Sequence, residues 1–165
     1  MRPRRPKDNG TMEQVKPLTI DEMYISPFTA RRVYDEEGNI KWIPLERNLH
    51  PTGERHVDAL LQAFAEGHSD PKWIAQRLGC KREDIWGFVR ALTGMSMREF
   101  RHAYGFRLAD DLLRYTSMTV GEVARRTGFY SASVLCQQFM KYHHQLPLAR
   151  RRALRAPNDK GRYRV

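Results

Sequence analysis

The side chains best suited to recognising a partner lie in the segment GEVARRTGFYSASVLCQQFMKY, from Gly121 to Tyr142. On its second helical pattern, Ser133, Cys136 and Gln137 fall on the outward face. A glutamine amide both donates and accepts, so it can pair with the edge of adenine. A helix that recognises nucleic acid often has arginine at such a position, because arginine pairs with guanine. The segment therefore raises the question of what its second helix contacts.

No set of residues suited to catalysis or metal binding accompanies this segment. The chain has no Gly-rich phosphate loop, no HExxH and no GxSxG motif. Cys80 and Cys136 lie 56 residues apart without a CxxC partner, a spacing that fits neither a disulfide framework nor a zinc site. His143 and His144 are adjacent, so they point about 100° apart on a helix, and a third ligand is lacking. We expect no enzymatic activity, no cofactor and no metal.

The basic charge is concentrated in the C-terminal two-thirds of the chain. Residues 1–54 carry nine basic and nine acidic side chains, whereas residues 55–165 carry 20 and 10, so the latter account for the net charge of +10. This asymmetry favours a polyanionic partner, first of all nucleic acid, with solubility alone as the alternative. No apolar run exceeds three residues, so we expect no membrane span, no signal peptide and a cytoplasmic location.

The elements that would position these side chains are helices. Asp70 and Pro71 predict a helix start, as N-cap and first helical residue. Capping boxes that begin at Ser96 and Thr119 open two further helices, and Pro147 opens a short last one.

Apolar spacing indicates which side chains face the core. Two stripes at helical spacing comprise Val57, Leu60, Leu61 and Phe64, and then Phe100, Tyr104, Leu108, Leu112 and Tyr115. We also expect Trp73 in the core, and Ile85, Phe88, Val89, Leu135 and Phe139 to face inward. Trp86 fits a core position and an exposed contact position equally well.

An internal repeat organises this helical part. WIAQRLGC at residues 73–80 resembles EVARRTGF at residues 122–129, at an offset of 49 residues. In both copies an Ala permits a close helix crossing, and a Gly ends the first helix in a left-handed conformation. A second helix follows each copy. The repeat predicts two helix-turn-helix units in tandem, joined by a long helix from Ser96 to Tyr115.

The remaining segments are short. Residues 1–17 are rich in Pro and charge and predict a disordered basic tail, and residues 18–53 form a small extension. Within the extension, DEEGN separates two apolar stretches, a pattern typical of a β-hairpin. Residues 156–165 predict a polar, frayed C-terminal tail.

The residues of the two tandem units and of the helix between them resemble the AraC/XylS family of bacterial transcription regulators. The resemblance covers roughly residues 55–152, and it is most specific in RLADDLL (residues 107–113) and TVGEVARRTGFYSAS (residues 119–133). LTGMSMREF at residues 92–100 is also similar to the end of that family's first unit. The implied DNA-binding domain spans residues 54–155, with the first unit at about 70–93, the linker helix at about 96–116 and the second unit at about 119–143.

The resemblance also implies a mechanism and a set of contacts. The second helix of each unit, called here its reading helix, would enter a major groove, with the two grooves about 34 Å apart on one face of double-stranded DNA. The implied contacts on the first reading helix are Lys81, Arg82, Glu83, Trp86, Gly87 and Arg90. Those on the second are Ser131, Ala132, Ser133, Cys136, Gln137 and Lys141. Lys81 and Ser131, at the helix starts, are placed to meet phosphates.

The two reading helices each depart from the family pattern at one position. The family often carries Arg where this chain has Gly87 and Gln137. Gly87 offers no side chain, whereas Gln137 can still pair with adenine. The sequence therefore predicts either an unusual base preference or reduced specificity.

We expect a mainly α protein that acts as a sequence-specific DNA-binding transcription regulator. The alternative is a protein-interaction co-regulator with a degenerate DNA-binding fold, acting on RNA polymerase or on another regulator. Longer family members have a sensory domain of about a hundred residues ahead of the DNA-binding part, and only about 54 residues precede it here. The resemblance therefore implies a stand-alone type without a small-molecule effector domain.

Overall fold

The structure is a computed structural model that describes residues 15–165. Most of the predicted basic tail, residues 1–14, lies outside the described residues. In chain order the elements are α1 (Ile20–Met23), β1 (Ala30–Tyr34), β2 (Ile40–Pro44), α2 (Arg55–Ala65), α3 (Pro71–Leu78), α4 (Arg82–Thr93), α5 (Met97–Tyr115), α6 (Val120–Arg126), α7 (Ala132–His143), α8 (Pro147–Leu154) and β3 (Tyr163–Arg164). The expected mainly helical fold is confirmed.

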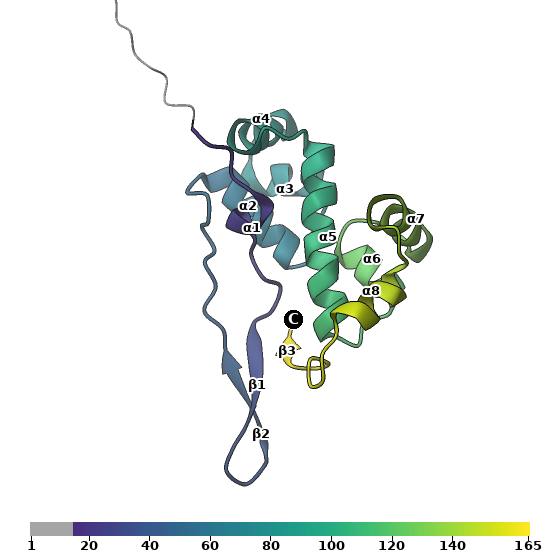
Figure 1. The fold of residues 1–165 in the computed structure, drawn as a ribbon. Helices are drawn as coiled ribbons and strands as arrows, with labels where there is room; N and C mark the ends of the chain where they lie inside the picture. The colour runs from purple at the N-terminus through teal and green to yellow at the C-terminus, as the bar shows by residue number, and fades with distance from the viewer. Residues whose placement is uncertain (1–14) are drawn as a thin grey trace, which may run out of the picture.

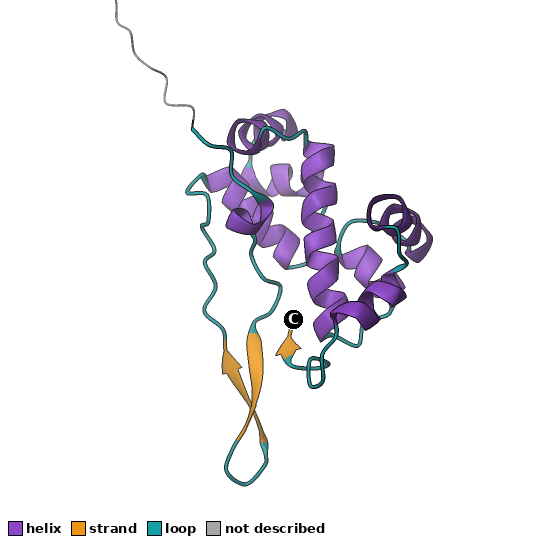
Figure 2. Ribbon diagram, viewed as in Figure 1, coloured by secondary structure: helices purple, strands orange, loops and turns teal. Residues whose placement is uncertain are grey.

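The long helix α5 runs through the middle of the molecule and joins the two helix-turn-helix units (Figure 1). The first unit is α3–α4, with α1 and α2 beside it, and the second is α6–α7, followed by α8. The β1–β2 hairpin projects beyond the helices (Figure 2).

The predicted helix starts are confirmed by their caps. The Asp70 carboxylate accepts from the backbone N–H of Lys72. The Ser96 and Thr119 side chains each accept from the backbone of the glutamate three residues later, and that glutamate accepts in return from the backbone of the cap. Each box satisfies two backbone donors that a helix leaves unpaired, so these starts are local properties of the sequence.

Two apolar cores lie along α5, one for each unit. The first core joins α1 to α4 with the N-terminal half of α5 and contains Leu60, Ile85 and Phe100. The second joins α6 and α7 with the C-terminal half of α5 and contains Leu112 and Phe139. Each unit therefore folds around its own interior, and the shared helix carries one side of both.

Two aromatic side chains expected in the core are more exposed than the pattern suggested. Trp73 is 36% exposed and stacks on His68, with ring centroids 4.4 Å apart. Phe88 is 37% exposed and stacks on His56 at 5.2 Å. Both predictions were wrong, because each ring lies at the border of its helix's apolar stripe and is covered on one side by a histidine rather than by the core.

The C-terminal segment is ordered, contrary to the predicted frayed tail. Arg164 and Tyr163 in β3 pair with Ala30 and Arg31 in β1, so the expected hairpin is part of a three-stranded antiparallel sheet in the order β2–β1–β3. The buried carboxylate of Asp159 accepts from Nε of Arg114 at 2.8 Å and from the backbone of Ala156. These long-range interactions hold the segment in place, and its polar composition gave no sign of them.

The Tyr163 ring anchors the same segment. It stacks on Phe28 at 4.9 Å and meets Tyr115 edge-on at 4.9 Å. The sheet is thereby attached to the C-terminal end of α5. None of the helices within residues 15–165 is long and apolar enough to cross a membrane.

Candidate nucleic-acid interface

The first reading helix, α4, begins after Lys81, whose backbone N–H donates to the Asp84 carboxylate at 3.2 Å. Ile85 and Val89 are fully buried and fix the rotation of the helix against the first core. The candidate contact residues on the helix are all exposed: Arg82, Glu83, Trp86, Gly87 and Arg90.

Trp86, which the sequence left open, lies on the exposed side. Its side chain is 37% exposed, and the Arg82 guanidinium lies over the ring at 4.6 Å from the centroid. Arg82 also pairs with Glu83 at 3.5 Å. The outer face of α4 therefore combines an aromatic surface with charges of both signs, and Gly87 offers no side chain for a base contact.

The second reading helix, α7, begins at the cap Ser131, whose hydroxyl accepts from the backbone of Val134 at 3.3 Å. Leu135 and Phe139 are fully buried, as predicted, and anchor the helix in the second core. Ser133, Gln137 and Lys141 are exposed, whereas Ala132 and Cys136 are only half-buried. The structure thus places the polar candidates of α7 on one accessible face, with Cys136 at its edge.

The turns that precede the reading helices depend on glycine. Gly79 and Gly128 both have positive φ, 66° and 82°. A Cβ on Gly128 would lie 3.0 Å from the Ser69 side chain, because the second turn packs against the α2–α3 loop, just before the first unit. The repeat read from the sequence therefore reflects two constraints at Gly128: a left-handed backbone and a close approach.

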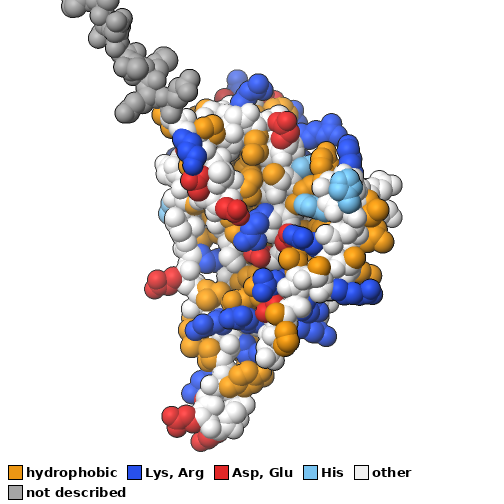
Figure 3. Space-filling model, viewed as in Figure 1, with side chains coloured by type: hydrophobic (Ala, Val, Ile, Leu, Met, Phe, Trp, Pro, Cys, Tyr) orange, Lys and Arg blue, Asp and Glu red, His pale blue; other side chains and the backbone are white. Residues whose placement is uncertain are grey.

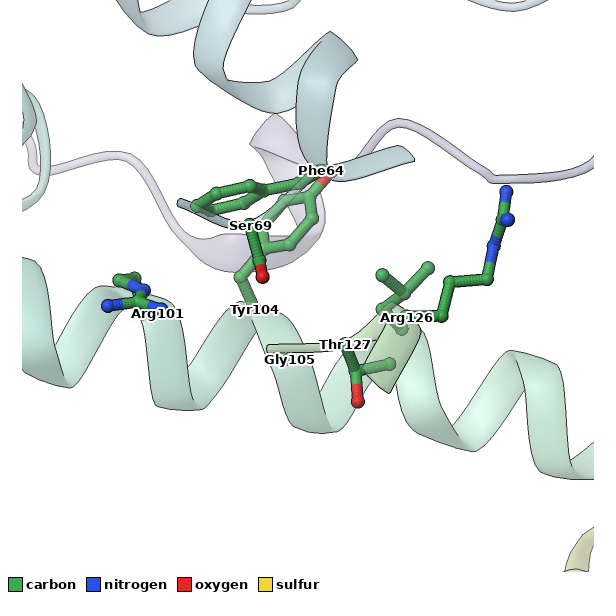
Figure 4. Close-up of a pocket in the computed structure, with 8 residues that line it drawn as sticks. Phe64, Ser69, Arg101, Tyr104, Gly105, Arg126 and Thr127 are labelled. Carbon is green, nitrogen blue, oxygen red and sulfur yellow. The ribbon is translucent and has the colours of Figure 1, made fainter. Parts of the chain in front are cut away.

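The seam between the two units is closed by side chains from both (Figure 4). Nη2 of Arg126, at the end of α6, reaches across to the carbonyl oxygen of Ala65 at the end of α2, 3.4 Å away. Burial lowers the pKa of the Arg126 guanidinium, and no other charge contributes to the shift. On α5, Gly105 lets Phe129 and the Thr127 carbonyl approach. The gap that remains is about 10 Å³, room for about one water molecule.

Positive charge collects where the units meet on the side of the reading helices. Burial, followed by the charges of Arg98, Arg101 and Lys141, holds the pKa of His102 below its ordinary value of 6.5. These cations therefore lie close enough to His102 to disfavour a further positive charge. Sequence reasoning missed Arg98, Arg101 and Tyr130 of this region. The sequence did contain a signal for this region: Tyr130, an aromatic residue, stands directly before the Ser131 cap, where a residue that tolerates a tight turn is usual.

Two arginines of the Arg150–Arg152 run are engaged within the protein. Arg150 forms a two-pronged ion pair with Asp110, at 2.9 and 2.6 Å, and this pairing raises the pKa of Arg150. Arg151 donates to the backbone carbonyls of Leu113 and Met118. These bonds fasten α8 to the C-terminal half of α5 and to the loop that follows it. Within residues 15–165 no three His, Cys, Asp or Glu side chains gather in a way that could hold a metal ion.

Comparison with known families gives one match. A family model described as a helix-turn-helix domain matches residues 74–153. The matched segment begins within α3 and ends within α8, so it contains both turns, both reading helices and α5. Neither the curated proteins nor the solved structures give a match to this chain.

Proposed function

Residues 74–153 are a helix-turn-helix DNA-binding domain of the AraC type, and we therefore propose that the protein reads two adjacent major grooves of double-stranded DNA with α4 and α7. The family resemblance seen in the sequence is confirmed. Such a domain implies DNA-binding transcription regulation and is not an enzyme. The proposal adds the sequence-specific use of both reading helices at once.

The observation that carries the proposal is the connection of α4 and α7 through one helix. α5 runs unbroken for 19 residues, which is about 28 Å at 1.5 Å per residue. It contributes buried side chains to both cores, so each unit is packed against the same rod. Adjacent major grooves on one face of DNA are about 34 Å apart, and two rigidly joined reading helices suit that spacing.

The proposed contacts divide into two kinds. Arg90 and Lys141, exposed at the last turns of their helices, and Lys81, at a helix start, would meet phosphates. Trp86 and Gln137 would face base edges, with Gln137 suited to adenine and the indole of Trp86 to a thymine methyl group or a sugar. Arg82, Glu83, Ala132, Ser133 and Cys136 would complete the two surfaces, with Gly87 and Ser131 supplying backbone or hydroxyl contacts.

Selection of bound DNA from a random duplex pool at about 0.15 M salt tests this function. The expected product is an asymmetric motif of two elements one helical turn apart, bound well above random DNA. Binding without an enriched motif would mean that the protein binds the DNA backbone without sequence specificity. A single enriched element would mean that only one reading helix is used.

A protein-contacting role is a second candidate because of the β1–β2 hairpin. The hairpin projects away from α4 and α7 (Figure 1), and it carries Tyr34 at 60% and Ile40 at 54% exposure. Such an arm is placed to contact RNA polymerase or another regulator while the reading helices face DNA. Tyr34→Ser and Ile40→Ser should then abolish transcriptional output and leave DNA affinity unchanged. Unaltered output in both variants would remove this candidate.

A further inference from the structure

A hollow of about 420 Å³ lies at the start of α5, between α4 and the turn before α7. We call it the interunit notch. Its lining includes Trp86 from α4, Arg98, Arg101 and His102 from the first turns of α5, and Phe129 and Tyr130 from the turn before α7. In Figure 3, basic side chains and histidines appear around the upper end of α5, between α4 and α7. Both units and their linker helix therefore contribute to the notch.

The arginines of the notch have no acidic partner within the described part of the chain. Arg98 is exposed and Arg101 half-buried, and neither forms an ion pair with a carboxylate of residues 15–165. By contrast, Arg107, Arg114 and Arg150 all pair with aspartates. Those three arginines are neutralised within the fold, whereas Arg98 and Arg101 are available to pair with an external anion.

Tyr130 has a conformation that packing does not explain. Its φ is 63°, in the left-handed region that disfavours side chains other than Gly and Asn. Its side chain is 74% exposed, so burial offsets little of this cost. Nη2 of Arg101 lies 3.4 Å from the Tyr130 hydroxyl oxygen, which accepts this bond and leaves the hydroxyl hydrogen free. A strained, exposed tyrosine beside an unpaired arginine indicates a binding role.

We infer that the interunit notch binds phosphates of a DNA strand that borders the minor groove between the two major grooves. With α4 and α7 in adjacent major grooves, that strand passes the protein between α4 and the turn before α7, the two segments that border the notch together with α5. Arg98 and Arg101 pair with non-bridging phosphate oxygens, and the Tyr130 hydroxyl donates to one of them. The inference rests on the proposed function and adds to it a binding site outside both reading helices.

The interaction is independent of base sequence, since it involves only the backbone. It would hold the central part of the site against the protein and fix the register of both reading helices. Because this chain has Gly87 where the family often carries arginine, its first reading helix lacks one possible DNA contact. Phosphate binding in the notch would supply affinity that the first reading helix does not.

Salt-dependent binding of the full chain to a two-element duplex obtained by the selection above tests the inference. Arg101→Gln should weaken binding roughly 10-fold near 0.1 M salt and reduce the slope of log K against log salt by about 0.9 for each phosphate that is no longer neutralised. Arg101→Lys should retain most of that slope, because it retains the charge. Arg31→Gln, on the exposed hairpin, is the matched control and should change neither quantity.

Neutralising selected phosphates of the DNA locates the interaction on the duplex. Neutral methylphosphonate linkages placed between the two elements should weaken binding of the parent protein and have little further effect on Arg101→Gln. Tyr130→Asn should weaken binding while its melting temperature stays equal to or above that of the parent, because Asn tolerates the left-handed backbone.

The outcomes distinguish this inference from the proposed function. If the parent protein binds the duplex and Arg101→Gln shows the same salt slope, the notch does not bind phosphate, and the groove-reading function stands. An equal decrease in affinity on the methylphosphonate duplex for the parent and for Arg101→Gln would also overturn the inference. If the parent protein binds no duplex at any salt concentration, both proposals fall.

Discussion

The Arg126 guanidinium and the Ala65 carbonyl oxygen, 3.4 Å apart, join the end of the second unit's first helix to the end of α2 in the first unit. The hydrogen bond spans 61 residues of sequence and lies beside Gly67, whose Cβ, if present, would be 3.3 Å from Arg126. The negative end of the α2 dipole faces the guanidinium. This bond adds a second connection between the units beside α5, and it restricts their relative rotation.

Arg126→Ala should therefore affect two-element binding more than folding. We expect a decrease of roughly 1–2 kcal/mol in the free energy of unfolding, since a half-buried side chain and one charged hydrogen bond are removed. Affinity for a two-element duplex should fall further than affinity for either element alone, because the relative rotation of the two units is then less restricted. Anisotropy titrations with the three duplexes measure this difference. The neighbouring Arg125→Ala, at an exposed position, is the control and should leave the ratio of affinities unchanged.

Two glycines within reading and linker helices should respond in opposite directions to alanine. A Cβ on Gly105 would lie 2.8 Å from Cε2 of Phe129 and 2.9 Å from the Thr127 carbonyl oxygen, so Gly105→Ala must displace the second turn. We expect a net destabilisation of about 1–2 kcal/mol even after the gain in helix propensity. A methyl group on Gly87 would meet no atom within 4 Å outside the backbone of its own helix, so Gly87→Ala should stabilise α4 by about 0.5–1 kcal/mol. Denaturant unfolding of both variants measures these changes, and a stabilised Gly105→Ala would contradict the close packing at the seam.

Gln137 should determine the base preference at one position of the second element. Gln137→Ala should reduce discrimination there by about 1–3 kcal/mol, and Gln137→Arg should shift the preference from adenine towards guanine. To reveal the change, each position of the site is replaced in turn by each of the four bases, and the affinity for every such duplex is measured. Preferences in the first element should stay as they are, since α4 is unaltered. An unchanged preference throughout would place Gln137 outside the base contacts.

The free energy of unfolding should fall on acidification, over a pH range set by the pKa of His102. Its pKa in the folded protein lies below 6.5 because of burial and the charges of Arg98 and Arg101 on α5 and Lys141 on α7. On acidification the unfolded chain therefore takes up a proton at His102 at a higher pH than the folded protein does. The contribution of neutral His102 to the free energy of unfolding is complete above about pH 6.5 and is lost as the pH falls through the folded-state pKa.

Thermal unfolding of the parent protein and of His102→Gln between pH 5 and pH 8 checks this. The parent should lose stability below about pH 6.5, and the variant should lose less. The capping glutamates Glu99 and Glu122, whose pKa values are lowered from 4.5 by hydrogen bonds to Ser96 and Thr119, act in a more acidic window. Identical pH profiles for the two proteins would count against this role of His102.

The helices of the two units and the linker helix follow from the sequence alone, because their signals are local, whereas α1 was not predicted. A capping box satisfies backbone donors within four residues, and an apolar stripe at helical spacing can be read without knowing its partner. Ser96 and Thr119 therefore marked the starts of α5 and α6 correctly. The internal repeat indicated the tandem units, and the family motifs indicated the class of partner. The family resemblance implied the contact positions on α4 and α7, and their contacts with DNA stay predictions.

Which distant side chains meet, by contrast, depends on the folded chain. Tyr163 pairs its strand with β1 and stacks on Phe28, an interaction between the two ends of the chain that no local pattern encodes. Arg126 closes the seam, whereas its neighbour Arg125 stays exposed, and both read alike as helix-surface arginines in the sequence. Arg101 and Tyr130 form one notch because α5 brings the second turn beside its own first turns. Charge and exposure at such places depend on packing between elements, and that packing exists only once the chain has folded.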